Sequence, residues 1–270
     1  MAKPLLPDAL WELIAPLLPP PKPRRHDHPG RKPLDNRKAL TGILFILKTA
    51  LPWEDLPQEM GCGCGMTCWR RLRDWQHAGV WMKLHALLLA KLRGADRIDW
   101  SRAAIDSASA RAFEGVQDSG PNPTDRGRPG VKHHVLVDAD GIPLAADVTA
   151  ANVPDVKELL TLVDSIGPVA GKPGRPKRRP EKLYGDRAYD SQPHREQLRA
   201  RGIEPQLAKR QTAHGSGLGV FRWVAERTLS WLHGFRKLRL VTEKNLDMQY
   251  AFLTLAVSVI CYRYLGIPIC

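Results

Sequence analysis

The chain has 270 residues, 43% of them hydrophobic and 26% charged, a globular balance that excludes wholesale disorder. Its 41 Lys and Arg residues exceed its 28 Asp and Glu residues, and the net charge of +13 favours nucleic acid as a partner. A basic protein with a solvated surface, or one touching anionic lipid, is the alternative. Five cysteines and no secretory signal at the start argue against a disulfide framework, so we expect a cytoplasmic protein.

The chain opens with a short amphipathic helix and a basic arm. Residues 8–18 fit the helix, with Asp8 as its N-cap. The arm, residues 22–32, is rich in proline and contains Arg24 and Arg25. It is either a solvated linker or an arm that follows DNA phosphates.

Residues 35–92 carry helical patterns throughout. A short helix at 53–60, a glycine-rich turn at 61–65 and a basic helix begun at Thr67 give the outline of a helix-turn-helix. On this interpretation three side chains of the basic helix approach DNA: Arg70, Arg71 and Arg73.

Three cysteines lie in or just after the glycine-rich turn, namely Cys62, Cys64 and Cys68. A zinc site is one interpretation, with His77 as the nearest fourth ligand. The spacing lacks the paired C-x-x-C arrangement typical of such sites, so we favour small residues in a tight turn.

From about Ile98 the hydrophobic period changes to that of strands. Buried strands are predicted at 103–107 and 182–186, and a hairpin turns at Asp140-Gly141. Helices are predicted at 154–166, at 193–200 and from about 220 to 240. Strands interleaved with helices indicate a mixed α/β sheet with helices packed against it.

A second basic loop, rich in proline and glycine, spans residues 171–180. Its cations join the candidate DNA contacts: Arg175, Lys177, Arg178 and Arg179. The most apolar stretch, residues 248–260, is too short to span a bilayer, so we expect a buried helix and no membrane partner.

Three acidic residues stand out by their context. Asp106 lies within an apolar strand, Asp186 ends a strand after Gly185, and Glu226 lies on the long helix. At about 100° per residue, that helix presents one stripe for packing: Val220, Val224, Trp231, Phe235 and Leu238. The opposite side carries the glutamate among cations: Arg222, His233 and Lys237. Taken alone, the helix favours a surface ion pair between Glu226 and Arg222.

The segments that carry these acids resemble those of DDE-type insertion-sequence transposases with a ribonuclease H-like catalytic domain. They are Ala104-Ile105-Asp106-Ser107, the run from Tyr184 to Asp190, and the run from Arg222 to Trp231. The stretch from Leu51 to Pro57 also resembles the N-terminal region of that family. The resemblance implies a small all-α, helix-turn-helix-like region at about 1–95, followed by a ribonuclease H-like α/β domain at 96–270.

The resemblance also implies a catalytic triad of Asp106, Asp186 and Glu226. Two Mg²⁺ or Mn²⁺ ions about 4 Å apart can activate the attacking oxygen and stabilise the leaving one. We expect Asp106 to bridge both ions, and Arg222 to hold a phosphate or orient Glu226. The family has a tyrosine where this chain has Gly219 and a lysine where it has His233. Lys237, one turn beyond His233, is the candidate substitute for that cation and a further DNA contact.

The implied activity is that of a transposase. It would bind the terminal inverted repeats of an insertion sequence, nick the DNA and join 3′-hydroxyl ends to target DNA, as a homo-oligomer associated with the nucleoid. Two alternatives stay open. One is a two-metal nuclease of the same fold without strand transfer. The other is a catalytically inactive DNA-binding relic or repressor. Gly219 and His233 support it, because they depart from the family's tyrosine and lysine.

Overall fold

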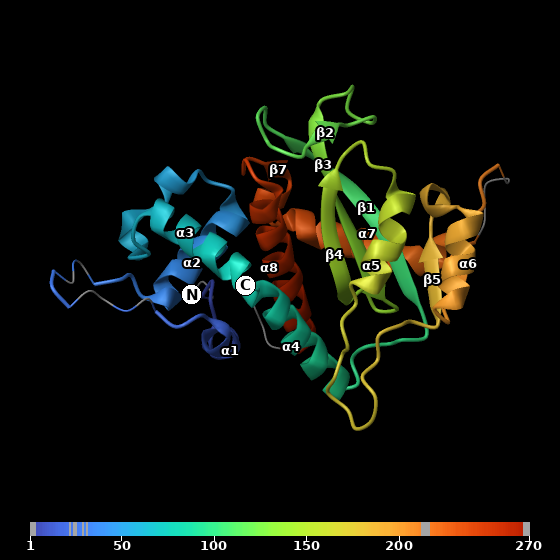
Figure 1. The fold of residues 1–270 in the computed structure, drawn as a ribbon, viewed down its shortest axis with the longest axis horizontal. Helices are drawn as coiled ribbons and strands as arrows, with labels where there is room; N and C mark the ends of the chain where they lie inside the picture. Colours follow the sequence, from blue (N-terminus) through green and yellow to red (C-terminus); the bar gives the residue numbers. More distant parts are fainter. Residues whose placement is uncertain are drawn as a thin grey trace.

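A mixed β-sheet lies beside a group of helices formed by the first third of the chain (Figure 1). The computed structural model describes residues 4–21, 23, 26–28, 30, 32–211 and 217–266. Arg24 and Arg25 of the basic arm lie outside the described residues.

The sheet combines an antiparallel half with a parallel half. Its strands are β1 (Ala103–Ala112), β2 (Gly120–Pro121), β3 (Pro129–Asp138), β4 (Pro143–Ala150), β5 (Lys182–Gly185), β6 (Glu204–Leu207) and β7 (Leu240–Val241). β1, β3 and β4 pair antiparallel, whereas β5 runs parallel to β1, and β6 parallel to β5. This order confirms the expected mixed sheet, and the β3–β4 turn at Asp140-Gly141 confirms the predicted hairpin.

Helices cover both faces of the sheet. The main contacts with the strands come from α5 (Asp155–Asp164), α6 (Gln192–Ala200), α7 (Gly219–Gly234) and α8 (Leu246–Tyr264). The other helices are α1 (Asp8–Ile14), α2 (Asn36–Thr49), α3 (Gly65–His77) and α4 (Val80–Gly94). Figure 1 shows α5 in front of the strands and α7 behind them. The helix that carries Glu226 therefore packs on the face opposite α5.

The helical region departs from the sequence prediction in two places. The predicted helix at 53–60 is two 3₁₀ turns, Trp53–Asp55 and Gln58–Met60. α3 begins at Gly65 rather than after Thr67, with Cys64 as the N-cap. A Cβ at Gly65 would lie 1.6 Å from the Trp53 carbonyl oxygen, so only glycine allows this close approach.

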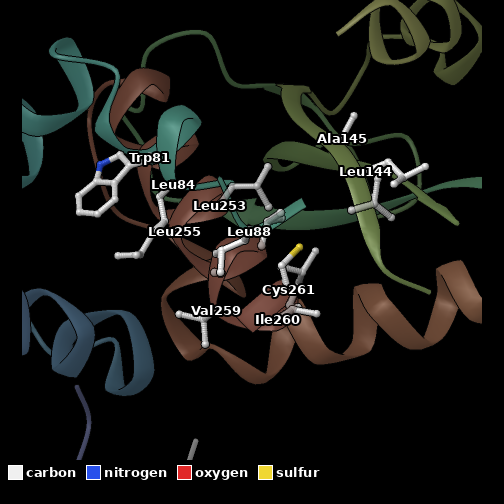
Figure 2. Packing of buried hydrophobic residues seen from close by; sticks show 14 of the residues in the cluster. Trp81, Leu84, Leu88, Leu144, Ala145, Leu253, Leu255, Val259, Ile260 and Cys261 are labelled. Carbon is white, nitrogen blue, oxygen red and sulfur yellow. The ribbon is translucent and has the colours of Figure 1, made fainter. Parts of the chain in front are cut away.

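α8 is the centre of the hydrophobic core. It is buried almost all round, which explains why the sequence shows no polar stripe there. Figure 2 shows side chains of this core from three elements: Leu84 of α4, Leu253 of α8 and, on the side of the sheet, Leu144 of β4. One continuous core thus joins the helical region to the sheet. Among the described residues, no helix combines the length and apolar character needed to cross a membrane.

Candidate active site and basic groove

Asp106 and Asp186 lie at matching positions of two neighbouring parallel strands. β1 and β5 pair with Ala104 opposite Tyr184, and each aspartate follows two residues later. Neighbouring strands are about 4.8 Å apart, and residues in register on parallel strands point to the same face. The strand pairing therefore brings the two carboxylates together where β5 ends.

Burial dominates the electrostatics of Asp106. It raises the pKa of the Asp106 carboxyl to about 6. The Ser107 N–H, donated to Oδ1 at 2.8 Å, and the Arg222 guanidinium act in the opposite direction. The carboxylates of Asp186 and Glu226 raise this pKa further, so all three acids lie within electrostatic reach of one another.

α7 brings Glu226 and Arg222 to the two aspartates, because it packs on β1 and contacts β5. The Glu226 side chain is 59% exposed, and its Oε1 lies 3.7 Å from Nη2 of Arg222, one turn earlier. Arg222 is mostly buried, and its Nε has no hydrogen-bond partner among the described residues. A guanidinium beside an exposed carboxylate is suited to bind a phosphate oxygen through its terminal N–H groups.

The donor set fits a hard divalent cation. Mg²⁺ and Mn²⁺ prefer carboxylate and water oxygens, and a cation would relieve the repulsion between Asp106, Asp186 and Glu226. In the part of the chain that the structure describes, no three His, Cys, Asp or Glu side chains converge closely enough to form a metal site. A cation here would therefore also need oxygens from water or from a bound phosphate.

The predicted packing stripe of α7 is wrong at two positions. Val220 and Trp231 are exposed, at 70% and 39%. Arg227 accounts for Trp231, because its guanidinium lies 4.7 Å from that ring and 4.6 Å from the ring of Trp223. The buried stripe instead consists of Val224, Ala225, Thr228, Leu229 and Leu232.

Lys237 is not placed where DNA could reach it. α7 ends at Gly234, so the helical wheel does not extend to this lysine. The Lys237 side chain is 3% exposed, and its Nζ lies 2.8 Å from Glu243 Oε1 and donates to Thr242 Oγ1 at 2.6 Å. Lys237 forms a buried ion pair with Glu243. The prediction that it contacts DNA and replaces the missing cation is therefore wrong.

His233 does not supply the missing charge either. Its ring packs edge-on against His133, with centroids 5.6 Å apart. Burial, and secondarily the Arg239 charge, lower the pKa of His233. A lowered imidazole pKa leaves the ring neutral near pH 7, so Arg222 remains the one predicted cation beside the described acids.

A basic groove lies between the start of α2 and the start of α3. It encloses about 760 Å³, and its walls carry four cations, Lys32, Lys38, Arg70 and Arg71. Lys32 ends the basic arm that the sequence analysis considered as a DNA contact. Lys38 was not predicted from the sequence, since it lies far before the basic helix in the chain. Four cations along one groove suit the negative charge of a sugar–phosphate backbone.

The other predicted DNA contacts are divided between two places. Arg73 bonds to Asp74 and lies 5.3 Å from the Trp69 ring, so it is partly engaged. The other four predicted contacts belong to the loop 171–180, which leads into the start of β5. Asp186 follows the end of β5, so the loop and this acid lie at opposite ends of the strand. Within the loop, Arg179 bonds to Asp164 at 2.9 Å, and the exposed members are Arg175, Lys177 and Arg178.

The three clustered cysteines make local hydrogen bonds. The Cys68 thiol donates to the Cys62 carbonyl at 3.3 Å, and Cys64 lies 3.3 Å from the Thr67 hydroxyl. All three are free thiols, and burial raises the pKa of Cys68 to about 12. A buried protonated thiol is a poor zinc ligand, in keeping with the tight-turn interpretation.

Two family models match the chain. The model described as "Transposase DDE domain" matches residues 100–261. The model described as "Putative transposase of IS4/5 family" matches residues 6–85.

Two proteins of Burkholderia cepacia are similar in sequence. The "Insertion element IS402 uncharacterized 16.2 kDa protein" is 69% identical over 123 residues, covering 46% of this chain and 84% of that protein. The "Putative transposase for insertion sequence element IS402" is 54% identical over 172 residues, covering 64% of this chain and 81% of that protein.

Among solved structures, the Mos1 strand transfer complex aligns with a TM-score of 0.30 at 10% identity, covering 90% of this chain and 79% of that chain. A pre-cleavage Mos1 transpososome aligns with a TM-score of 0.27 at 10% identity, covering 89% and 82%.

Proposed function

This chain belongs to the transposase family with a DDE catalytic domain, and from that premise we propose that it nicks the ends of an insertion sequence and joins them to target DNA. The observation that carries the proposal is the pairing of Asp106 with Asp186 on parallel strands, beside Glu226 and Arg222 of α7.

The proposal gives the three acids and Arg222 different roles. Asp106, Asp186 and Glu226 would hold Mg²⁺ or Mn²⁺, in our proposal two ions bridged by Asp106. Bound there, the metal would activate the attacking oxygen and stabilise the leaving one. Arg222 would orient the scissile phosphate through its guanidinium and keep Glu226 directed at the site.

The test is metal-dependent nicking of DNA that carries the element's own ends, comparing the unsubstituted chain with Glu226→Gln. We expect the substitution to lower cleavage about a hundredfold and to leave DNA binding unchanged, because a neutral amide is a weaker ligand for a hard cation. Glu196→Gln, at an exposed glutamate on α6, is the matched control. Equal cleavage by Glu226→Gln and the control would remove Glu226 from the triad.

DNA binding is proposed to use the basic groove and the exposed cations of the loop before β5. The double variant Lys38→Gln/Arg70→Gln should weaken binding to all sequences and lower the slope of log K against log salt by about 2, one unit for each phosphate that is no longer neutralised. Lys91→Gln, an exposed lysine at the far end of α4, is the control and should leave the slope unchanged. Filter binding between about 50 and 200 mM salt measures both, and equal slopes would exclude the groove.

A second candidate function rests on His233 and Gly219. Neither restores the charge or hydroxyl that the family carries at those positions, because burial lowers the pKa of His233 and Lys237 is engaged in a buried ion pair with Glu243. A DNA-binding relic or repressor of the element would bind the ends without cutting them in Mg²⁺ or Mn²⁺. Cleavage without joining would instead identify a nuclease. We further propose that the active form is a homo-oligomer on paired DNA ends, with residues 1–95 as the DNA-binding region.

A further inference from the structure

A chain of polar side chains lies directly behind Asp106, between the sheet and the start of α5. Ser107 is its centre: the hydroxyl donates to Asp155 Oδ1 at 3.0 Å, while the amide N–H donates to Asp106 Oδ1 at 2.8 Å. Lys132 of β3 donates to the same Asp155 oxygen at 2.8 Å. Both partners of this ion pair are largely buried, with side chains 13% and 19% exposed.

This chain ties the first acid to a fixed anchor. Breaking a largely buried ion pair is costly, so Asp155 and Lys132 hold each other in place. The serine hydroxyl is then oriented by Asp155, and the serine amide in turn orients Asp106. The Asp106 carboxylate is thus positioned from behind, away from the face that meets α7.

Tyr189 reaches the same cluster from the other side of Asp186. It is 1% exposed, and its ring packs on Gly185, where an added Cβ would lie 3.3 Å from Cδ2 of the ring. Its hydroxyl is buried and has no hydrogen-bond partner among the described residues, although Ser107 and the carboxylate of Asp155 lie close by. Burial raises the pKa of this phenol well above its ordinary value, so the hydroxyl keeps its proton.

We propose that Tyr189 is a positioning residue for Asp106 and acts through Ser107, by donating its hydroxyl hydrogen to Ser107 Oγ. The serine hydroxyl hydrogen is already directed at Asp155, so its oxygen is free to accept. The resulting chain runs in one direction, from the phenol to the serine to the aspartate. A buried hydroxyl without a partner is costly, and this bond would remove that cost.

The consequence is a link between Tyr189 and cation binding. The inference rests on the proposed function for the role of Asp106 as a metal ligand. Groups that orient metal ligands change metal affinity about 10–100-fold when removed. Because Tyr189 acts one step further back than Ser107, we expect the lower end of that range, about tenfold.

The test compares Tyr189→Phe with Tyr262→Phe in the full chain. Tyr262 is the matched control, because it too is fully buried with an unpartnered hydroxyl among the described residues, but it lies in α8. Mn²⁺ affinity is measured without DNA by electron paramagnetic resonance, and the Mn²⁺ concentration for half-maximal nicking is measured with DNA. We expect Tyr189→Phe to raise the Mn²⁺ dissociation constant and the half-maximal concentration about tenfold, Tyr262→Phe to change neither, and neither variant to lower the thermal unfolding midpoint.

Four outcomes decide the matter. Equal Mn²⁺ affinities for the two variants would overturn the inference while leaving the proposed function intact, provided that nicking persists. A loss confined to Tyr189→Phe in a chain that binds Mn²⁺ but never nicks would support the inference and contradict the proposed function. A chain without measurable Mn²⁺ affinity would overturn both. A tenfold loss accompanied by a lower unfolding midpoint in Tyr189→Phe alone would assign the residue a packing role and overturn the inference.

Discussion

Replacing Asp106 with asparagine should lower metal-dependent strand cleavage by at least about a thousandfold, because metal stabilisation of the developing charge is worth several kcal/mol and each 1.36 kcal/mol is about a factor of ten. The effect should exceed that of Glu226→Gln. Asp106 is raised in pKa by burial and is proposed to bridge both ions, whereas the Glu226 side chain is 59% exposed.

The same substitution should not weaken the fold. The folded pKa of Asp106 is about 6, raised above the ordinary value of 3.8, mainly by burial. The folded state therefore binds this proton more tightly than the unfolded state, and stability is lost as pH rises from about 4 to 6. The asparagine side chain carries no charge to bury, so at pH 8 the variant should unfold at a higher temperature than the unsubstituted chain. A buried charge that is needed for activity lowers the stability of the fold, so its removal is expected to raise stability and lower activity.

The measurement pairs nicking rates with thermal unfolding at pH 5 and pH 8. Asp147→Asn is the control, because Asp147 is an acid of the same sheet whose pKa is also raised by burial. It should keep its cleavage activity. Asp106→Asn that still cleaves at the unsubstituted rate would show that the metal site lies elsewhere, whatever its effect on unfolding.

The parts of the site that follow local patterns could be predicted from the sequence. The apolar run before Asp106 and the Gly185 before Asp186 identify strand ends, and parallel pairing then brings both aspartates together. Glu226 needed more than a pattern. Its helix places it correctly beside Arg222, but the same helical wheel fails at Val220 and Trp231, because the buried stripe of α7 depends on the shape of the sheet beneath it.

Contacts between distant segments could not be predicted. Lys32 and Lys38 meet Arg70 and Arg71 only because the turn at Gly65 packs against the Trp53 carbonyl. Tyr189 lies within a recognisable motif, but its place behind Asp106 depends on α5 supplying Asp155 from the opposite face. In each case the contact joins segments that are far apart in the sequence. The hydrophobic periodicity of either segment does not predict which other segment it will contact.

Lys237 is the clearest case, and it leads to the largest expected effect on stability. Its partner Glu243 is 7% exposed and accepts the indole N–H of Trp53 at 3.0 Å and that of Trp69 at 3.1 Å. The Lys237 ammonium also lies 5.7 Å from the ring of Phe252 in α8. The pair thus connects the helical region, through Trp53 and Trp69, to the segment that follows the catalytic helix.

Glu243→Gln should lower the free energy of unfolding by about 3–5 kcal/mol, because it leaves the Lys237 charge buried with only the Thr242 hydroxyl. The double variant Lys237→Met/Glu243→Gln should recover part of that loss, since no buried charge remains. The recovery is incomplete, because each carboxylate oxygen of Glu243 accepts one indole N–H, whereas glutamine keeps only one of these two acceptors. Urea unfolding of the two single variants and the double variant closes the cycle. A decrease in unfolding free energy below about 1 kcal/mol for Glu243→Gln, as measured for exposed ion pairs, would contradict this prediction. It would mean that water reaches the pair and that the pair does not stabilise the contact between α3 and the segment after α7.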